Sequence, residues 1–137
     1  MRVLVDTNVV LDLLSNRQPF FADSYEAVQL ALGKCSAYVS AITVADSVYI
    51  TRKVFPDSSD QKKVLENFFS QFKICPVKRT QLKKAFSSSM SDFEDAVQAF
   101  CAKSRRVSYI ITRNVKDYNL SPVKAVTPSD FVALMKK

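Results

Sequence analysis

Short apolar runs, separated by longer segments with helical spacing, predict five strands along the chain. The first run, Val3-Leu4-Val5, is uninterrupted and rich in β-branched residues, as expected for a strand buried on both faces of a parallel sheet. Four further runs predict strands over residues 34–40, 73–77, 108–112 and 124–126. Because Pro76 cannot donate to a strand ladder, the third strand is expected at a sheet edge.

Between the strands, apolar residues recur at the spacing of an amphipathic helix. Helices are predicted after residue 6 and, in chain order, over about 20–32, 40–53, 61–71, 80–88, 92–104 and from 128 onward. Tyr25, Tyr49 and Val64 fall at core-facing positions, and Gly33 is expected to end the second helix at its C′ position. Strands alternating with helices predict one α/β domain over residues 1–137, with a mostly parallel five-stranded sheet flanked by helices.

Five aspartates stand beside the predicted strand ends and helix starts. Asp6 follows the first strand, Asp46 lies early in the helix after the second, and Asp117 follows the fourth. Asp92 and Asp95 open the helix that precedes the fourth strand. Helix N-termini and strand carboxyl ends share one edge of a parallel sheet, where open α/β folds bind ligands. We therefore expect all five carboxylates at the same edge.

Taken singly, each of these acids also has a structural explanation as a cap, a first-turn residue or a turn residue. The segment Asp92-Phe93-Glu94-Asp95, for example, fits a capped helix start with acids in the positive first turn. Five other acids are assigned to solvation or capping alone: Asp12, Asp57, Asp60, Glu66 and Asp130. Only the joint placement of the five aspartates at one edge favours a functional site.

The composition limits the chemistry available at this edge. The chain has no histidine, so neither a His-ligated zinc nor a histidine base is possible. Its single glycine excludes the dinucleotide fingerprint and the P-loop, which need two or more. Cys35, Cys75 and Cys101 form no CxxC pair and are expected to be reduced core residues of an intracellular protein.

Crowded carboxylates repel one another unless a positive charge lies among them. Oxygen ligands without imidazole or thiolate select a hard cation, Mg²⁺ or Mn²⁺. The formal charge of +7, from 20 lysines and arginines against 13 acids, favours a polyanionic partner. A basic surface around an acidic metal site is typical of phosphodiester chemistry, in which the metal activates water and stabilises the leaving oxygen. We expect metal-assisted phosphodiester hydrolysis.

Four segments, in order, resemble the motifs of the PIN-domain family: residues 3–8, 39–46, 92–96 and 109–118. Arg17-Gln18-Pro19-Phe20 and Thr112-Arg113-Asn114 are similar to the VapC-like group of bacterial PIN proteins. This resemblance covers nearly the whole chain. It implies a three-layer α/β/α fold with strand order 3-2-1-4-5. It also implies a Mg²⁺- or Mn²⁺-dependent ribonuclease, often dimeric and often the toxin of a toxin–antitoxin pair.

The resemblance also implies roles for individual residues. Asp6 and Asp95 match the family's principal metal-binding acids, and Asp117 matches the late acid. Asp46 stands where the family more usually has glutamate, so its shorter side chain is expected to reach the metal through water. These four acids form the expected catalytic set, and Asp92 is a further metal candidate. Supporting roles fall to Thr7, Asn8, Thr112 and Asn114, and substrate contacts to Arg113 and Lys116.

Two alternatives remain open on the sequence. Asp6 could be the nucleophile of a phosphoaspartyl phosphatase-like protein, although Asn8 occupies the place of the second acid in Asp-x-Asp. The chain could instead be a degenerate, non-catalytic PIN module that binds RNA or a protein, which the Asp46 departure favours.

The expected partners are an RNA substrate, a cognate antitoxin and a second copy of the chain. No membrane contact is expected, because no apolar run approaches transmembrane length. Asp6, Asn8 and Asp12 interrupt the apolar N-terminus and exclude a secretory signal, so a cytoplasmic protein is expected.

Overall fold

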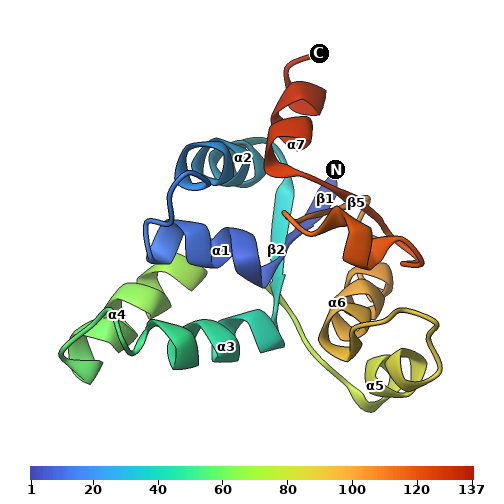
Figure 1. The fold of residues 1–137 in the computed structure, drawn as a ribbon, viewed down its shortest axis with the longest axis horizontal. Helices are drawn as coiled ribbons and strands as arrows, with labels where there is room; N and C mark the ends of the chain where they lie inside the picture. The colour runs from blue at the N-terminus through green and yellow to red at the C-terminus, as the bar shows by residue number, and fades with distance from the viewer.

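A computed structural model describes residues 1–137 as a five-stranded sheet between two layers of helices (Figure 1). The strands are β1 (Arg2–Val5), β2 (Ser36–Ser40), β3 (Lys73–Cys75), β4 (Tyr109–Ile111) and β5 (Lys124–Val126). Their order is β3-β2-β1-β4-β5, and each neighbouring pair is parallel. The predicted fold class and strand order are confirmed, and β3 lies at an edge.

The central strand β1 is apolar without alternation because both of its faces are buried. Val3, Leu4 and Val5 are all fully buried. Val3 and Val5 belong to the core on one face of the sheet, whereas Leu4 belongs to the core on the other. Helices cover both faces, so each side chain of this strand needs an apolar neighbour.

The two helical layers are unequal. One face is covered by α1 (Thr7–Leu14), α2 (Phe21–Lys34), α3 (Ala41–Thr51), α4 (Ser58–Phe69) and α7 (Pro128–Met135). The other is covered by α5 (Arg79–Phe86) and α6 (Phe93–Ser104). A short 3₁₀ helix, η1 (Val115–Tyr118), follows β4 and adds Tyr118 to this second core. None of the helices has the length and apolar character needed to cross a bilayer.

Four local predictions are wrong. Gly33 does not end α2, because the helix continues through Lys34 and Cys35 is its C-cap. Tyr25, Tyr49 and Val64 were placed in the core but are exposed. The sheet covers only one side of each of these helices, so the apolar stripe in the sequence is wider than the buried stripe.

Candidate active site at the carboxyl edge of the sheet

Asp6 is the centre of the site. It follows β1, caps the N-terminus of α1 and is nearly completely buried. Its backbone N–H donates to the Ile111 carbonyl at 3.0 Å, which fixes the residue between the ends of β1 and β4. The strand end therefore places a carboxylate at the carboxyl edge of the sheet, as the sequence predicts.

The Asp6 carboxylate accepts five hydrogen bonds. Oδ1 accepts from the Thr7 backbone N–H at 2.7 Å and from Gln98 Nε2 at 3.0 Å. Oδ2 accepts from the Thr112 hydroxyl at 2.8 Å, the Tyr118 hydroxyl at 3.1 Å and Asn8 Nδ2 at 3.4 Å. These donors come from α1, α6, η1 and the residue after β4, so Asp6 is held by four segments of the fold.

The expected supporting residues lie in this hydrogen-bond network. Asn8 Nδ2 also donates to the Thr112 hydroxyl at 3.1 Å, and the hydroxyls of Thr7 and Thr43 lie 2.9 Å apart. Asn114 contributes its backbone N–H, which donates to Thr112 Oγ1 at 3.1 Å. The sequence analysis did not identify Thr43, Gln98 or Tyr118. The sequence neighbours of Thr43 and Gln98 are mainly apolar, so both have the pattern of an ordinary core position, whereas Tyr118 lies in a polar segment that shows nothing of its contacts.

A tyrosine hydroxyl links Asp6 to Asp95. The Tyr118 hydroxyl lies 3.1 Å from Asp6 Oδ2 and 3.4 Å from Asp95 Oδ1. The Tyr118 side chain is buried, and this burial together with the charges of the two carboxylates raises its pKa well above the usual range. Tyr118 is therefore a neutral hydrogen-bond donor at physiological pH.

Asp95 is the most strongly perturbed carboxyl of the expected metal set. Burial raises its pKa, and the charges of Asp6, Asp92 and Asp117 raise it further, to about 7, against the lowering effect of the Tyr118 hydrogen bond. Asp92 is the exposed N-cap of α6 and accepts from the Asp95 backbone N–H at 2.9 Å. The four aspartates are thus close enough for their charges to interact.

Asp46 has a carboxyl partner that the sequence analysis did not include among the site residues. Glu94, on the first turn of α6, has its pKa raised to about 7. A hydrogen bond with Asp46 is the main cause, followed by burial and by the charges of Asp46, Asp92 and Asp95. The sequence analysis assigned Glu94 to the helix start alone, because an acid next to Asp95 suits the first turn of a helix as well as it suits a metal site.

Exposed polar residues surround a hollow beside η1. Arg113, Asn114, Lys116 and Asp117 line this hollow, which has a volume of about 370 Å³. The Lys116 and Asp117 side chains are exposed. The hollow therefore has an exposed cation, Lys116, beside an exposed acid of the expected site, Asp117.

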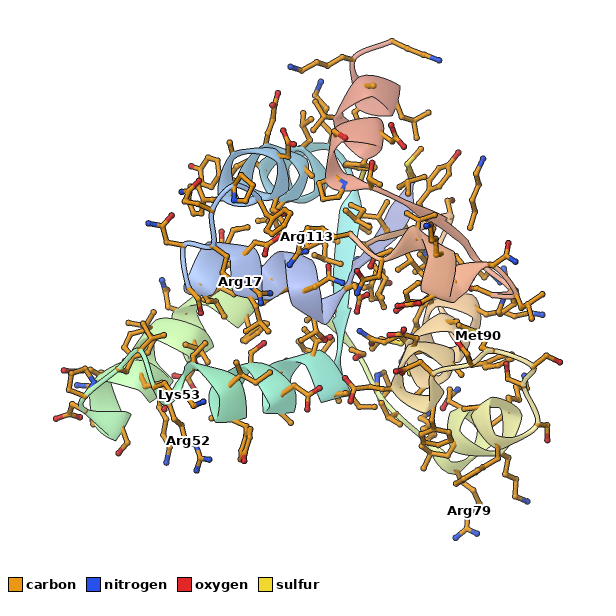
Figure 2. The ribbon with its side chains drawn as sticks, in the orientation of Figure 1. Arg17, Arg52, Lys53, Arg79, Met90 and Arg113 are labelled. Carbon is orange, nitrogen blue, oxygen red and sulfur yellow. The ribbon has the colours of Figure 1, made fainter.

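The assignment of Asp12 to solvation or capping is wrong. Its carboxylate is fully buried and accepts from Arg113 Nε at 2.8 Å, Arg113 Nη2 at 3.1 Å, Arg17 Nε at 3.1 Å and Ser24 Oγ at 2.7 Å. Figure 2 shows Arg17 and Arg113 over α1. The Arg113 guanidinium also lies 3.8 Å from the centre of the Phe20 ring. Most of the Arg113 guanidinium therefore contacts Asp12 of α1 and Phe20, the N-cap of α2. Only its exposed part is accessible to a substrate.

The oxygen-only donor set of the site suits a hard cation. No three acidic or cysteine side chains lie close enough to one point to hold a metal ion by themselves. Asp6 and Asp95 of the expected metal set are joined through the Tyr118 hydroxyl. Gln98 Oε1, on the residue that donates to Asp6, is buried and has no hydrogen-bond partner. These residues fit an ion held by two carboxylates and completed by water, as is usual for Mg²⁺.

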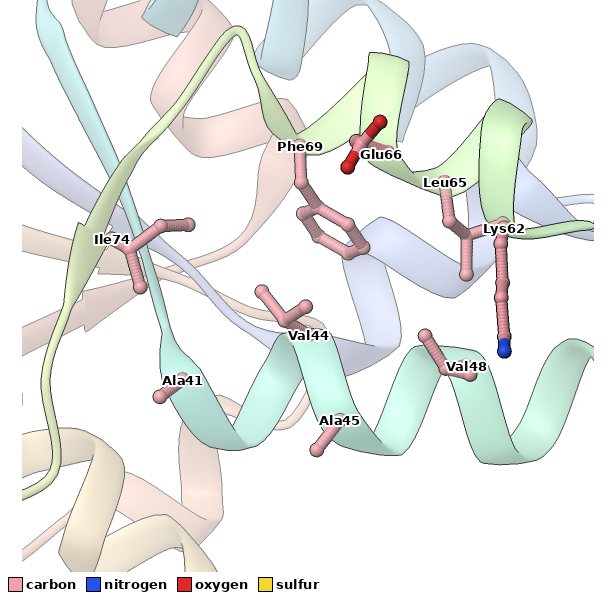
Figure 3. Close-up of a pocket in the computed structure, with 9 residues that line it drawn as sticks. All are labelled: Ala41, Val44, Ala45, Val48, Lys62, Leu65, Glu66, Phe69 and Ile74. Carbon is pink, nitrogen blue, oxygen red and sulfur yellow. The ribbon is translucent and has the colours of Figure 1, made fainter.

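A separate apolar groove lies between α3 and α4. It has a volume of about 580 Å³, and Val44, Val48, Leu65 and Phe69 form much of its wall (Figure 3). Lys62 and Glu66 also line it. None of the candidate acids lines this groove, so it is distinct from the carboxylate site.

Sequence comparison places the chain in a known family. The model of the PIN domain matches residues 2–116, most of the chain. The chain belongs to the PIN domain family. The resemblance noted in the sequence is confirmed, and this membership gives no support to a phosphoaspartyl protein. No curated protein matches this PIN domain by sequence.

Solved structures with the same fold come from several bacteria. The PIN domain is similar to a chain of VapBC2 from Rickettsia felis bound to promoter DNA, with 16% identity, 93% and 98% coverage of the two chains and a TM-score of 0.71. It resembles a Klebsiella pneumoniae toxin–antitoxin complex at 24% identity, 92% and 97% coverage and a TM-score of 0.72. It also resembles FitAcB from Neisseria gonorrhoeae at 20% identity, 92% and 97% coverage and a TM-score of 0.70. At these identities the likeness shows the fold alone.

Proposed function

We propose that this PIN domain is a Mg²⁺- or Mn²⁺-dependent endoribonuclease. The observation that carries the proposal is the pair Asp6 and Asp95, which face one tyrosine hydroxyl at the carboxyl edge of the sheet. Burial and the charges of Asp6, Asp92 and Asp117 raise the pKa of Asp95 to about 7, and a divalent cation would relieve this repulsion.

Asp6 and Asp95 are the residues proposed to bind the cation directly. Asp117, Asp92 and Asp46 would act at longer range, through water or through their charge, and Glu94 joins them as the partner of Asp46. When bound, the ion supplies an activated water and neutralises the leaving oxygen of the phosphodiester.

The protein's own contribution is to orient the acids and to bind the substrate. Gln98, Thr112 and Asn8 fix the plane of the Asp6 carboxylate through hydrogen bonds, so little reorganisation is needed when substrate arrives. Lys116, with the exposed part of Arg113, would bind backbone phosphates in the hollow beside η1. The net charge of +7 attracts a polyanion from a distance.

RNA is proposed as the substrate because the chain is a PIN domain similar to the VapC-like ribonucleases. The test is cleavage of a mixed RNA pool by the purified protein with Mn²⁺, with Mg²⁺ and with chelator. We expect cleavage only with metal, and Asp6→Asn should reduce it by about a hundredfold or more while the circular dichroism spectrum is kept.

Asp57→Asn is the matched control for this test. Asp57 is also an N-cap aspartate, but it is exposed. It caps α4 by accepting hydrogen bonds from the backbone N–H groups of Ser59 and Asp60. This variant should cleave like the wild type. Metal-independent cleavage, or equal activity in Asp6→Asn, would contradict the proposal.

A second candidate function is a non-catalytic PIN module that binds RNA or a protein. The absence of a complete three-carboxylate group favours it, as does the shorter Asp46. RNA binding without cleavage in either metal, over the whole RNA pool, would support this alternative.

We further propose that the protein is a VapC-like toxin that works with a cognate antitoxin and forms a homodimer. The fold is shared with chains of toxin–antitoxin complexes, and the α3–α4 groove offers a protein partner an apolar surface. Growth arrest on expression of the wild type, but not of Asp6→Asn, would support the toxin role. The molecular mass in solution tests the dimer.

A further inference from the structure

Tyr118 places a hydroxyl group between the two carboxylates proposed to bind the cation. We infer that this hydroxyl and the cation compete for the same position, so that Tyr118 sets the metal affinity of the site. The inference rests on the proposed function, because it takes Asp6 and Asp95 as ligands. It concerns a residue to which the sequence analysis gave no role in the site.

The hydrogen bonds of Asp6 occupy the acceptor sites of its carboxylate. Its two oxygens accept five hydrogen bonds, whereas a carboxylate offers about four lone-pair sites. A cation can therefore bind only where a donor is displaced. The Tyr118 hydroxyl is the one donor that also bonds Asp95, so its displacement frees both carboxylates at once.

Three of the other four donors to Asp6 are less free to leave. The Thr7 donor is a backbone N–H at the start of α1, and Thr112 is fixed by its backbone N–H, which donates to the Val126 carbonyl at 2.9 Å. Gln98 is buried in α6. Tyr118, in contrast, belongs to a four-residue 3₁₀ helix next to exposed residues. A shift of its hydroxyl requires a movement of this short helix together with the Tyr118 ring, which packs in the second core.

The electrostatics favour exchange of the phenol for a cation. A neutral hydroxyl offers one proton to two carboxylates, and the pKa of Asp95 stays raised despite this contact. A divalent ion neutralises both charges. Without any ion, the phenol still reduces the repulsion, so it stabilises the protein in that state. Removing the hydroxyl should therefore weaken the ion-free protein and strengthen ion binding.

The experiment compares Tyr118→Phe with the wild type by calorimetric titration with MnCl₂ at neutral pH. The variant should bind Mn²⁺ about tenfold more tightly, since a hydrogen bond to a charged group no longer has to be broken. Its melting temperature without metal should fall, and the increase caused by Mn²⁺ should be larger than in the wild type. Tyr38→Phe, a buried tyrosine of β2 outside the Asp6 network, is the matched control and should behave like the wild type.

A second readout follows the phenol itself. The chain has five tyrosines and no tryptophan, so its near-ultraviolet spectrum above the phenylalanine bands comes mainly from tyrosine. Addition of Mg²⁺ should produce a tyrosine difference spectrum in the wild type and in Tyr38→Phe, but not in Tyr118→Phe. This signal depends on neither cleavage nor RNA.

The possible failures are distinguishable. If the wild type binds Mn²⁺ and Tyr118→Phe binds it equally or more weakly, the inference is overturned and the proposed function is untouched. If the wild type binds no Mn²⁺ at millimolar concentration, the proposed function and this inference both fall. A difference spectrum that survives in Tyr118→Phe would also overturn the inference.

Discussion

Arg113 and Asp12 form a two-point ion pair between residues 101 positions apart in the chain. The backbone N–H of Arg113 also donates to Asn8 Oδ1 at 3.1 Å, and Asn8 in turn contacts Asp6 and Thr112. The pair therefore fastens the segment after β4 to α1, next to the Asp6 carboxylate. Its position gives it both a stabilising role and an effect on the geometry of the site.

Asp12→Asn should destabilise the protein strongly. The substitution leaves two arginines facing a neutral amide at a fully buried position, and loss of one partner of a buried ion pair typically costs about 3–5 kcal/mol. Urea unfolding followed by circular dichroism measures this loss. Glu66→Gln, at an exposed position of α4 without an ion pair, should change the free energy of unfolding by less than about 0.5 kcal/mol. A loss for Asp12→Asn as small as this would show that the ion pair contributes little to stability.

Asp95→Asn should increase stability without metal, and the increase should depend on pH. The Asp95 pKa rises from 3.8 to about 7 on folding, so the folded protein holds this proton more tightly than the unfolded chain does. The charged carboxylate therefore opposes folding above pH 7, and this penalty disappears as the pH falls toward 3.8. Urea unfolding at pH 8 should show a clear advantage of the variant, and at pH 4.5 a much smaller one. An advantage that does not change with pH would contradict the raised pKa.

Glu94→Gln should weaken Mn²⁺ binding by about tenfold, in the range found for residues that contact metal ligands indirectly. Glu94 adds negative charge beside Asp46 and Asp95 and shares a hydrogen bond with Asp46. Titration with Mn²⁺ measures the loss. Glu26→Gln, an exposed glutamate of α2 paired with Lys136, is the control and should bind Mn²⁺ like the wild type. Equal Mn²⁺ binding by the two variants would show that Glu94 does not contribute to the metal site.

The main features of the fold follow from local patterns in the sequence, and the candidate site follows only in part. Val3-Leu4-Val5 is apolar on both faces and ends at Asp6, so a parallel sheet brings Asp6 to the ligand-binding edge whatever the details of packing. Asp12 could not be placed in this way. Its main partner Arg113 is 101 residues away, and a lone acid on a helix is usually solvated.

The role of Tyr118 likewise could not be predicted from the sequence. A tyrosine one residue after Asp117 is expected to be buried for its ring alone, and nothing local shows what its hydroxyl meets. Its contacts with Asp6 and Asp95 depend on the path of η1 across the end of α6. When a site is completed by side chains from several elements, these residues can be identified only from the three-dimensional structure.

The α3–α4 groove should be needed for antitoxin binding but not for cleavage. Ala45 is an exposed groove residue on α3, and Ala45→Arg would place a long charged side chain against an apolar partner surface. Coexpression with the product of an adjacent antitoxin gene should rescue growth for the wild type and fail for Ala45→Arg. Lys53→Ala, in the turn after α3 (Figure 2) and outside the groove, is the control and should still be rescued. Rescue of both variants would place the partner elsewhere.

Crystals of the protein soaked in millimolar MnCl₂ test the metal site most directly, by anomalous diffraction at a wavelength where manganese scatters. We expect an anomalous peak within bonding distance of carboxylate oxygens of both Asp6 and Asp95, and no such peak in crystals of Asp6→Asn. A wild-type map without density between these two carboxylates, or with manganese bound only elsewhere on the surface, would contradict the proposed metal-dependent nuclease.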